Sequence, residues 1–356
     1  FQTISIYERN LCYSQLNRKV SHCNLIKKLT FPGRFLYKGF AGVKKLLTNK
    51  YPSVLLVQNI KDVRSRFDNL SSGFSFNYPQ GTRKNAGFLL LSGADPLNNG
   101  EPLIELWDLN EQELIYKWVF DIDQFIKKSG LNISKDDLFF WHPLLLNDGN
   151  LSVIADNSTL VKFSSKGEII KVNREYKFHH TQEIDKQGKI YVPINNQRYS
   201  LQSKGRNPKH GINEGFAILD QDLEVLKTYS MEEIYQNSGL NYKINYGALS
   251  GDPFHINDVE PLIDDFETKV VLLSLRHKSA IIAFDLLDEK ILWILEGYGK
   301  YQHDVDFVDN KENIISIFDN NTTYQKDGSI TSEGNIFTII SNLPYPIKSE
   351  KQKKKT

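Results

Sequence analysis

Short apolar runs, each bounded by turn residues, recur along the chain from about residue 51 onward. They are rich in aliphatic, β-branched and aromatic residues, which is typical of buried β-strands. The clearest runs cover residues 87–92, 151–155, 189–194, 270–275 and 313–318. The pattern therefore predicts a chain built almost entirely from short strands.

A hairpin pattern accompanies most of these runs: an apolar segment, a polar turn and a second apolar segment. It appears at residues 103–118, 160–171, 216–227 and 281–293, and Gly167 marks the clearest of the turns. A four-stranded unit repeated every ~40–50 residues is the sequence signature of a β-propeller blade. The linkers are too short for the helices of a TIM barrel. The sequence thus predicts an all-β propeller with about five legible blades.

Three segments are predicted. Residues 1–50 carry basic residues on an apolar background and predict a lead-in segment with some helix around residues 25–47. The propeller domain is expected to span residues 51–345, and the basic end, residues 346–356, is expected to be a disordered tail. Two longer inserts, residues 199–214 and 231–251, are expected to be face loops that can cover a central site.

Composition narrows the functional classes. The chain has 44 basic and 43 acidic side chains, a net charge of +1, so nothing electrostatic favours a nucleic-acid partner. Its two cysteines, Cys12 and Cys23, give neither a disulfide framework nor a zinc-binding spacing. No apolar run reaches the ~18 residues of a transmembrane helix, and no secretory signal segment is visible.

Histidines recur at one place in the repeat. His142, His180, His255 and His303 each lie just before the first strand pair of a unit. Equivalent positions in a ring lie at equal distance from its axis, so these side chains are expected to converge at one mouth of the central channel. A lone histidine is usually structural, and the repetition is what favours a shared functional centre.

Other polar residues lie near these histidines in the sequence. Asn257 is expected to share a face with His255, two residues before it. Arg276 ends the run 270–275 and offers a permanently charged donor fork that suits an oxyanion, although alone it would be interpreted as a surface ion pair. Asp304 and Asp306 either orient His303 or are ordinary polar residues of a turn and strand end.

The order and spacing of these motifs resemble those of a known family. Residues 252–260, 272–279, 291–293 and 302–306, together with the segment 178–180, look like the core of the arylsulfotransferase (arylsulfate sulfotransferase) family. The resemblance covers roughly residues 85–320. It implies a six-bladed propeller that moves a sulfuryl group from an aryl sulfate donor to a phenolic acceptor, without a cofactor, through a sulfo-histidine intermediate in a ping-pong cycle.

The resemblance also implies roles for individual residues. His303 would be the nucleophile, and His255, Arg276 and His180 would complete the catalytic set; His180 is preferred over His179 because it is in register with the other repeats. Asn257, His179 and His142 are assigned to substrate binding, with a structural role as the alternative for His142. No cofactor or metal is implied. The implied partners are a small phenolic sulfate and a phenol; a homodimer is left open. The implied location is periplasmic or otherwise exported.

Several alternatives remain at this point. Five legible units against six implied blades mean that a blade is missing or that the lead-in segment completes the ring. A propeller whose histidines hold a divalent metal could be a hydrolase. Against it, no central carboxylate was found to repeat in register with the histidines, and Arg276 would repel a cation. A propeller with an incomplete ring could instead be a binding scaffold without catalysis.

Overall fold

The structure, a computed structural model, describes residues 2–5, 87–95, 100–135, 138–195, 214–244, 253–262, 267–308, 314–324, 330–332 and 336–341. Within these ranges the chain is mainly β-strand. The helices are α4 (Ile122–Ser129), α6 (Met231–Asn237) and the 3-10 turns η2 (Asn241–Lys243) and η3 (Arg276–Lys278). None of the described helices has the length and apolar character needed to cross a membrane.

Most strands belong to five sheets, here called blades 1 to 5, that follow one another along the chain. Blade 1 contains β1 (Gln2–Ser5), β2 (Phe88–Ala94), β3 (Pro102–Asp108) and β4 (Glu113–Trp118). Blade 2 contains β5 (Phe140–Leu145), β6 (Leu151–Ala155), β7 (Thr159–Phe163) and β8 (Ile169–Asn173). Blade 3 contains β9 (Lys177–Phe178), β10 (Glu183–Ile184), β11 (Ile190–Asn195), β12 (Glu214–Leu219) and β13 (Val225–Ser230).

Blades 4 and 5 complete the described set. Blade 4 contains β14 (Ile256–Pro261), β15 (Val270–Leu275), β16 (Ala280–Asp285) and β17 (Lys290–Glu296). Blade 5 contains β18 (His303–Phe307), β19 (Ile314–Asp319) and β22 (Ile336–Ser341). The strands β20 (Thr322–Tyr324) and β21 (Ile330–Ser332) form a separate two-stranded sheet.

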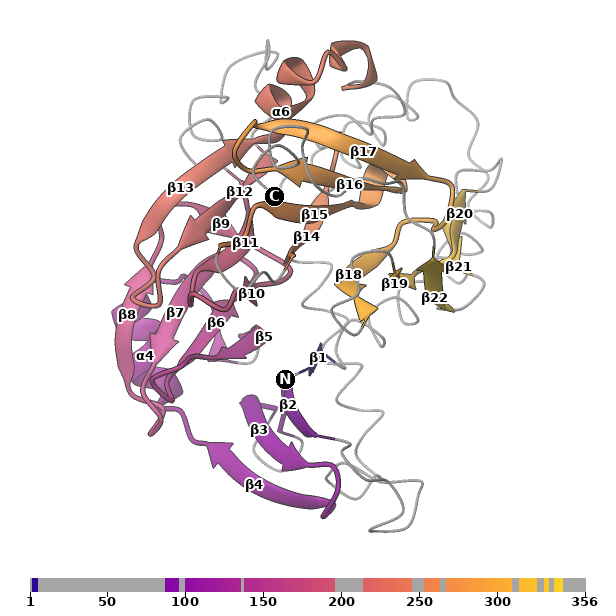
Figure 1. Ribbon diagram of the computed structural model, residues 1–356. Helices are drawn as coiled ribbons and strands as arrows, with labels where there is room; N and C mark the ends of the chain where they lie inside the picture. The colour runs from indigo at the N-terminus through magenta and orange to yellow at the C-terminus, as the bar shows by residue number, and fades with distance from the viewer. Residues whose placement is uncertain are drawn as a thin grey trace, which may run out of the picture.

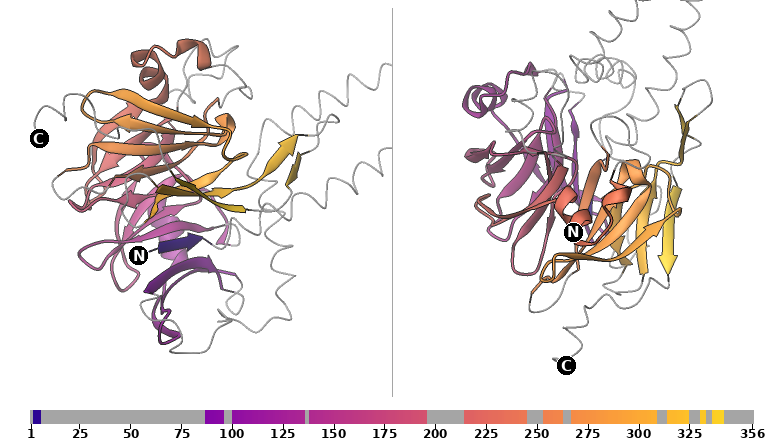
Figure 2. Two further views of the ribbon diagram at one scale, coloured as in Figure 1. Left: turned by 45° about the vertical axis from the view of Figure 1, so that its right-hand side comes forward. Right: turned by 90° about the horizontal axis from the view of Figure 1, so that it is seen from above.

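The blades are arranged around a common centre, in chain order (Figure 1). The first strands β5, β14 and β18 lie nearest the centre, and the last strands β4, β8, β13 and β17 lie on the outside (Figures 1 and 2). In blades 2 and 4 the order across the sheet equals the order along the chain, so each sheet is finished before the next begins. This radial stack of four-stranded sheets is the β-propeller architecture predicted from the repeat.

The strand predictions are confirmed in detail. The five apolar runs form β2, β6, β11, β15 and β19, and the four hairpins form the two outer strands of blades 1 to 4. Where the resemblance implied six blades, the described residues form five blades and the separate β20–β21 sheet. Strand β1, from the predicted lead-in segment, pairs in parallel with β2 of blade 1. The rest of that segment, residues 199–213 of the first insert and the basic tail lie outside the described residues.

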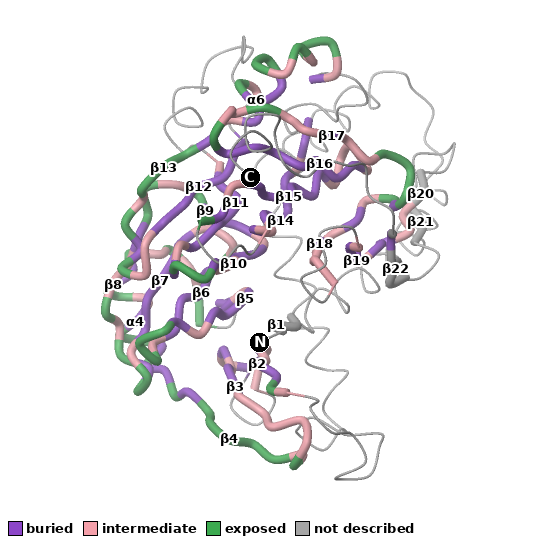
Figure 3. Tube along the Cα trace, viewed as in Figure 1, coloured by how far each residue is buried: buried purple, intermediate pink, exposed green. Residues whose placement is uncertain are grey.

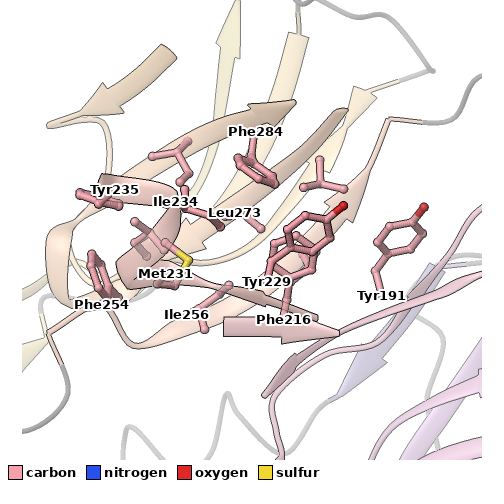
Figure 4. Packing of buried hydrophobic residues seen from close by; sticks show 14 of the residues in the cluster. Tyr191, Phe216, Tyr229, Met231, Ile234, Tyr235, Phe254, Ile256, Leu273 and Phe284 are labelled. Atoms are coloured by element: carbon pink, nitrogen blue, oxygen red, sulfur yellow. The ribbon is translucent and has the colours of Figure 1, made fainter. Parts of the chain in front are cut away.

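Apolar side chains from neighbouring blades hold the sheets together. All of β7 is buried, whereas β4 and the middle of β13 are largely exposed, so the burial decreases outward (Figure 3). Phe216 and Tyr229 of blade 3 stack with ring centroids 4.7 Å apart, and the Phe284 ring of blade 4 lies 6.1 and 5.4 Å from them (Figure 4). Helix α6 adds Met231 and Ile234 to this cluster, so the start of the second insert is a helix packed on the blades rather than a loop. Each such buried side chain contributes roughly 1.5–3 kcal/mol.

Side chains of neighbouring blades also accept hydrogen bonds from backbone N–H groups at the inner edges of the sheets, where no further strand pairs with those groups. Glu214 of blade 3 accepts hydrogen bonds from the N–H groups of Phe254 and Ile256, at 3.0 and 3.3 Å. Asp258 of blade 4 accepts from the N–H of Val305 at 2.8 Å. Unpaired strand edges are costly or aggregation-prone, and these carboxylates close them.

Candidate functional site

The histidine-bearing segments are irregular strands. The pairing of β14 with β15 shifts between Ile256 and Asp258, and that of β18 with β19 shifts between His303 and Val305. The backbone is left-handed at His180 and His255, with φ of 64° and 49°. Non-glycine residues seldom adopt this conformation, and bulges redirect the side chains beside them. The innermost strands are therefore built to turn side chains out of the regular sheet.

Three of the predicted histidines come together at the centre. The ring of His180 lies 5.0 Å from that of His255 and 5.8 Å from that of His303, measured between centroids. They come from blades 3, 4 and 5, and each is partly buried. The His180 ring thus lies against the rings of the other two histidines, as the repeat predicted.

His179 belongs to the edge of this group. Its Nδ1 lies 2.8 Å from Nδ1 of His180, so one ring donates a proton to the other. His179 is only 4% exposed, whereas His180 is partly exposed. The contact favours His180 as the ring that meets a substrate and His179 as the ring that orients it.

Arg276 lies beside His255, together with two residues that the sequence analysis did not single out. Its Nη1 is 3.1 Å from Nε2 of His277, and its Cζ is 5.0 Å from the centre of the Tyr301 ring. The His277 ring in turn lies 4.5 Å from the His255 ring. The turn η3 places these side chains, because the backbone N–H of Arg276 donates to the carbonyl oxygen of His255. The guanidinium of Arg276 is thus held against the rings of His277 and Tyr301.

The histidines are poised to be neutral. Burial lowers the pKa of His303 well below its usual value, and the charge of Arg276 lowers it further. Burial also lowers the pKa of His180, and interactions with the neighbouring histidines and with Arg276 act in the same direction. Both rings therefore hold a lone pair on one nitrogen at neutral pH.

His142 and Asn257 have other partners. Nδ1 of His142 accepts a hydrogen bond from the N–H of Gln182 at 3.2 Å, and burial lowers the pKa of His142 to about 4. The amide of Asn257 is fully buried and donates to the carbonyl oxygen of Gln302 at 2.8 Å. These contacts join blade 2 to blade 3 and blade 4 to blade 5. The structural alternative for His142 accounts for its contacts, and substrate binding by either residue stays a prediction.

Carboxylates do repeat in register with the histidines, and the sequence analysis was wrong on this point. Glu183, Asp258 and Asp306 each stand three residues after one of the converging histidines. Burial raises the pKa of Asp258 to about 7, and the charge of Asp306 adds to the effect. Across the described ranges, no three His, Cys, Asp or Glu side chains are grouped so as to hold a metal ion. An acidic layer thus accompanies the histidine layer.

Asn320 is a third residue that the sequence analysis missed. It follows β19 directly, and its Nδ2 lies 3.0 Å from Nδ1 of His303. The sequence left open whether Asp304 or Asp306 orients His303. A side-chain hydrogen bond to the ring comes from Asn320, because the β18–β19 register pairs His303 with Phe318, two residues before the amide. The backbone of Tyr301 also forms a hydrogen bond with the His303 ring.

Comparison with known proteins places this geometry in a family. A model of the arylsulfotransferase (ASST) family matches residues 144–344, more than half of the chain and all four of the segments that carry His180, His255, Arg276 and His303. No curated protein matches the sequence significantly.

Two solved structures that resemble it have low sequence identity to it. One is a protein of unknown function from Bacteroides caccae, with 10% identity, a TM-score of 0.42 and coverage of 70% of this chain and 72% of that one. Another is the β-propeller domain of Cps50 (Swd1) from Myceliophteria thermophila, with 10% identity, a TM-score of 0.40 and 72% coverage of each chain. It is the family match, spanning the converging histidines, that assigns the chain: it belongs to the arylsulfotransferase family.

Proposed function

We propose that this protein transfers a sulfuryl group from a phenolic sulfate ester to a phenolic acceptor, with a sulfo-histidine on His303 as the intermediate. Family membership supports an activity of arylsulfotransferase type. The observation that carries the finer proposal is the contact of the His180 ring with those of His255 and His303, with Arg276 beside them. The chemistry needs a nucleophile, an anion-binding group and a proton donor, and this group of side chains can supply all three.

His303 is the best nucleophile of the group. A neutral imidazole attacks through its lone pair, and the lowered pKa of His303 keeps the ring neutral below pH 6.5 as well as above it. In the first half-reaction the bond between sulfur and a ring nitrogen forms as the bond between sulfur and the phenol oxygen breaks. The bonding electron pair leaves with the phenol oxygen.

Arg276 and His180 suit the sulfuryl oxygens. A sulfate monoester carries a single negative charge, so one guanidinium can balance it. The Tyr301 ring under Cζ and the His277 ring beside Nη1 hold the guanidinium in place and leave its other N–H groups to donate. A neutral His180 adds a ring N–H donor. Donors fixed in advance stabilise the charge of the transition state most effectively.

His255 is the best-placed proton donor for the leaving oxygen. Its ring contacts His180 on one side and His277 on the other. A phenolate with a pKa of ~10 leaves more readily when a positioned imidazole protonates it. In the second half-reaction the same ring would take the proton from the acceptor phenol as that oxygen attacks the sulfo-histidine.

Intact-mass spectrometry tests the proposal most directly. The protein is incubated with 4-nitrophenyl sulfate without an acceptor, quenched near neutral pH and weighed beside His303→Asn, which keeps a polar side chain of similar length. We expect the wild-type chain to gain one sulfuryl group as one equivalent of 4-nitrophenol is released. The variant should gain none, and peptide mapping should place the group on His303.

Other outcomes would point to the competing functions. A label that persists in His303→Asn would overturn the nucleophile assignment. Phenol release that needs an added divalent metal, and stops with a chelator, would favour the metal-dependent hydrolase. Binding of the ester by a folded wild-type chain, with neither label nor release, would favour the scaffold. A matched thermal melt of both proteins shows that any difference is not a loss of fold.

A further inference from the structure

The hydrogen bond between Asn320 and His303 has a chemical consequence beyond holding the ring in place. The amide lies 3.0 Å from Nδ1, and Asn320 is 3% exposed, so solvent does not compete with it at that side of the ring. Both residues belong to blade 5, one at the start of β18 and the other just after β19. The contact is set by the pairing within one sheet and needs no movement between blades.

The partner of one ring nitrogen determines what the other nitrogen can do. A neutral imidazole carries its proton on either Nδ1 or Nε2, and only the bare nitrogen has a lone pair. If Nδ2 of Asn320 donates to Nδ1, the ring proton stays on Nε2, which then cannot attack. If Oδ1 faces the ring, Nδ1–H donates to it and the lone pair is on Nε2. The two ends of the amide exchange by a half-turn of its last torsion, with almost no change in shape.

We propose that Asn320 is a positioning residue that accepts the Nδ1 proton of His303 through Oδ1 and so directs the lone pair of Nε2 at the sulfur. This inference rests on the proposed function. As the Nε2–sulfur bond forms and the sulfur–oxygen bond breaks, the electron pair leaves with the phenol and the ring becomes positive. The Nδ1–H keeps its proton and donates more strongly to the amide oxygen. The charge on the attached sulfo group balances that of the ring.

An amide serves this role better than a carboxylate would. A carboxylate at the same place would favour the charged form of the ring, and the imidazolium has no lone pair. An amide oxygen fixes the tautomer without adding charge. The neighbouring charge of Arg276 lowers the pKa of His303, so an uncharged partner leaves that effect intact.

Two substitutions separate these contributions. Asn320→Leu removes the hydrogen bond and keeps a side chain with the same branching and number of heavy atoms, and Asn320→Asp replaces the amide by a charge. Asn321→Asp is the matched control, because it adds the same charge one residue further on, at a partly buried residue whose backbone N–H bonds to Asp319. The readouts are the rate of phenol release in a single turnover from pH 5 to 9, and the ¹⁵N NMR signals of His303 in histidine-labelled protein, assigned with His303→Asn.

The expected results are specific to positioning. Asn320→Leu should slow the release about 10–100-fold, the cost known for metal-bound histidines that lose their outer hydrogen-bond partner. The ester concentration that gives half the maximal single-turnover rate should change little. Its His303 signals should change from the Nδ1–H tautomer toward a mixture. Asn320→Asp should move the acid side of the rate profile to higher pH, and Asn321→Asp should not.

Either of two results would overturn the inference: an Nε2–H tautomer in the wild-type protein, or a wild-type rate and profile in Asn320→Leu. The NMR measurement needs no turnover. If the wild-type chain forms no sulfo-histidine, the proposed function fails, while the spectra still show whether Asn320 sets the tautomer. The His303 signals of Asn320→Leu could change toward a mixture of tautomers while its single-turnover rate stays at the wild-type value. Asn320 would then position the ring without any effect on transfer, which also contradicts the inference.

Discussion

At the scale of single residues, burial and the neighbouring charges together determine the protonation of His303 and His180. Arg276 contacts His277 through Nη1 and lies over the Tyr301 ring, and its charge lowers the pKa of both His303 and His180. In the proposed function, the same side chain adds to the effect of burial in keeping His303 neutral and also attracts the anionic substrate. These two effects can be separated, because only one of them needs the planar guanidinium.

Substitution of Arg276 should separate these effects in the pH profile of phenol release. In Arg276→Gln the cation is lost, so the pKa of His303 rises toward its ordinary value and the acid side of the profile moves to higher pH. Loss of an oxyanion donor should also lower the rate about 100-fold at pH 8. Arg276→Lys keeps the charge, so the acid side should stay in place while the rate still falls. An unshifted pH profile in Arg276→Gln would contradict the electrostatic role. Arg174→Gln is the control, because Arg174 directly follows β8, the outermost strand of blade 2.

Which site residues could be predicted depended on whether they follow the repeat. His180, His255 and His303 recur with the blades, and their convergence followed from that recurrence. His277, Tyr301 and Asn320 reach the site through the turn η3, a left-handed residue and the end of β19, none of which has a periodic signal. Their sequence neighbours were the only available hint: His277 follows Arg276, and Tyr301 lies two residues before His303.

At the scale of the elements, the innermost strands differ from the others. In blades 1 to 4 the second, third and fourth strands were predictable because they contain apolar runs joined by polar turns. The inner strands β5, β14 and β18 have register shifts beside their histidines, and in blade 3 two short pieces, β9 and β10, replace one strand. A broken ladder has no clean alternation, so its extent could not be predicted. Side chains such as Glu214 and Asp258 replace the missing ladder bonds.

The capping of β14 by Glu214 gives a prediction about stability. The carboxylate offers two oxygens to two N–H groups, whereas Glu214→Gln offers one oxygen and turns an N–H₂ toward the other. A buried N–H left without an acceptor costs about 1–3 kcal/mol, so the free energy of unfolding in urea should fall by that amount. Glu224→Gln, which disturbs only the exposed pair with Lys171, should change it by less than about 1 kcal/mol. Equal effects in the two variants would contradict the capping role.

At the scale of the whole molecule, the ring brings together two sets of ionisable groups whose pKa values shift in opposite directions on folding. Burial raises the pKa of Asp258 to about 7 and also raises the pKa values of the carboxyls of Glu183, Glu260 and Asp306. Burial lowers the pKa of His142 to about 4 and lowers those of His180 and His303. Each set comes from three blades, so its energetics belong to the assembled ring and not to any one sheet.

These shifts predict how the stability of the fold depends on pH. A carboxyl whose pKa is raised on folding contributes its full stability below ~4, and the contribution is lost as the pH rises through the folded value, about 7 for Asp258. A histidine whose pKa is lowered contributes fully above ~6.5 and loses the contribution as the pH falls toward the folded value, about 4 for His142. Below pH ~6.5 the two slopes oppose each other, and above it only the carboxyl slope remains. The Tm should therefore decrease from pH 6.5 to pH 8.

Asp306→Asn should flatten this decrease in Tm, because it removes one buried charge and so makes ionisation of Asp258 less costly. Glu113→Gln, on the exposed strand β4, should leave the decrease unchanged. A Tm that is constant or rises from pH 6.5 to pH 8 in the wild-type protein would show that ionisation of the buried carboxyls does not destabilise the fold.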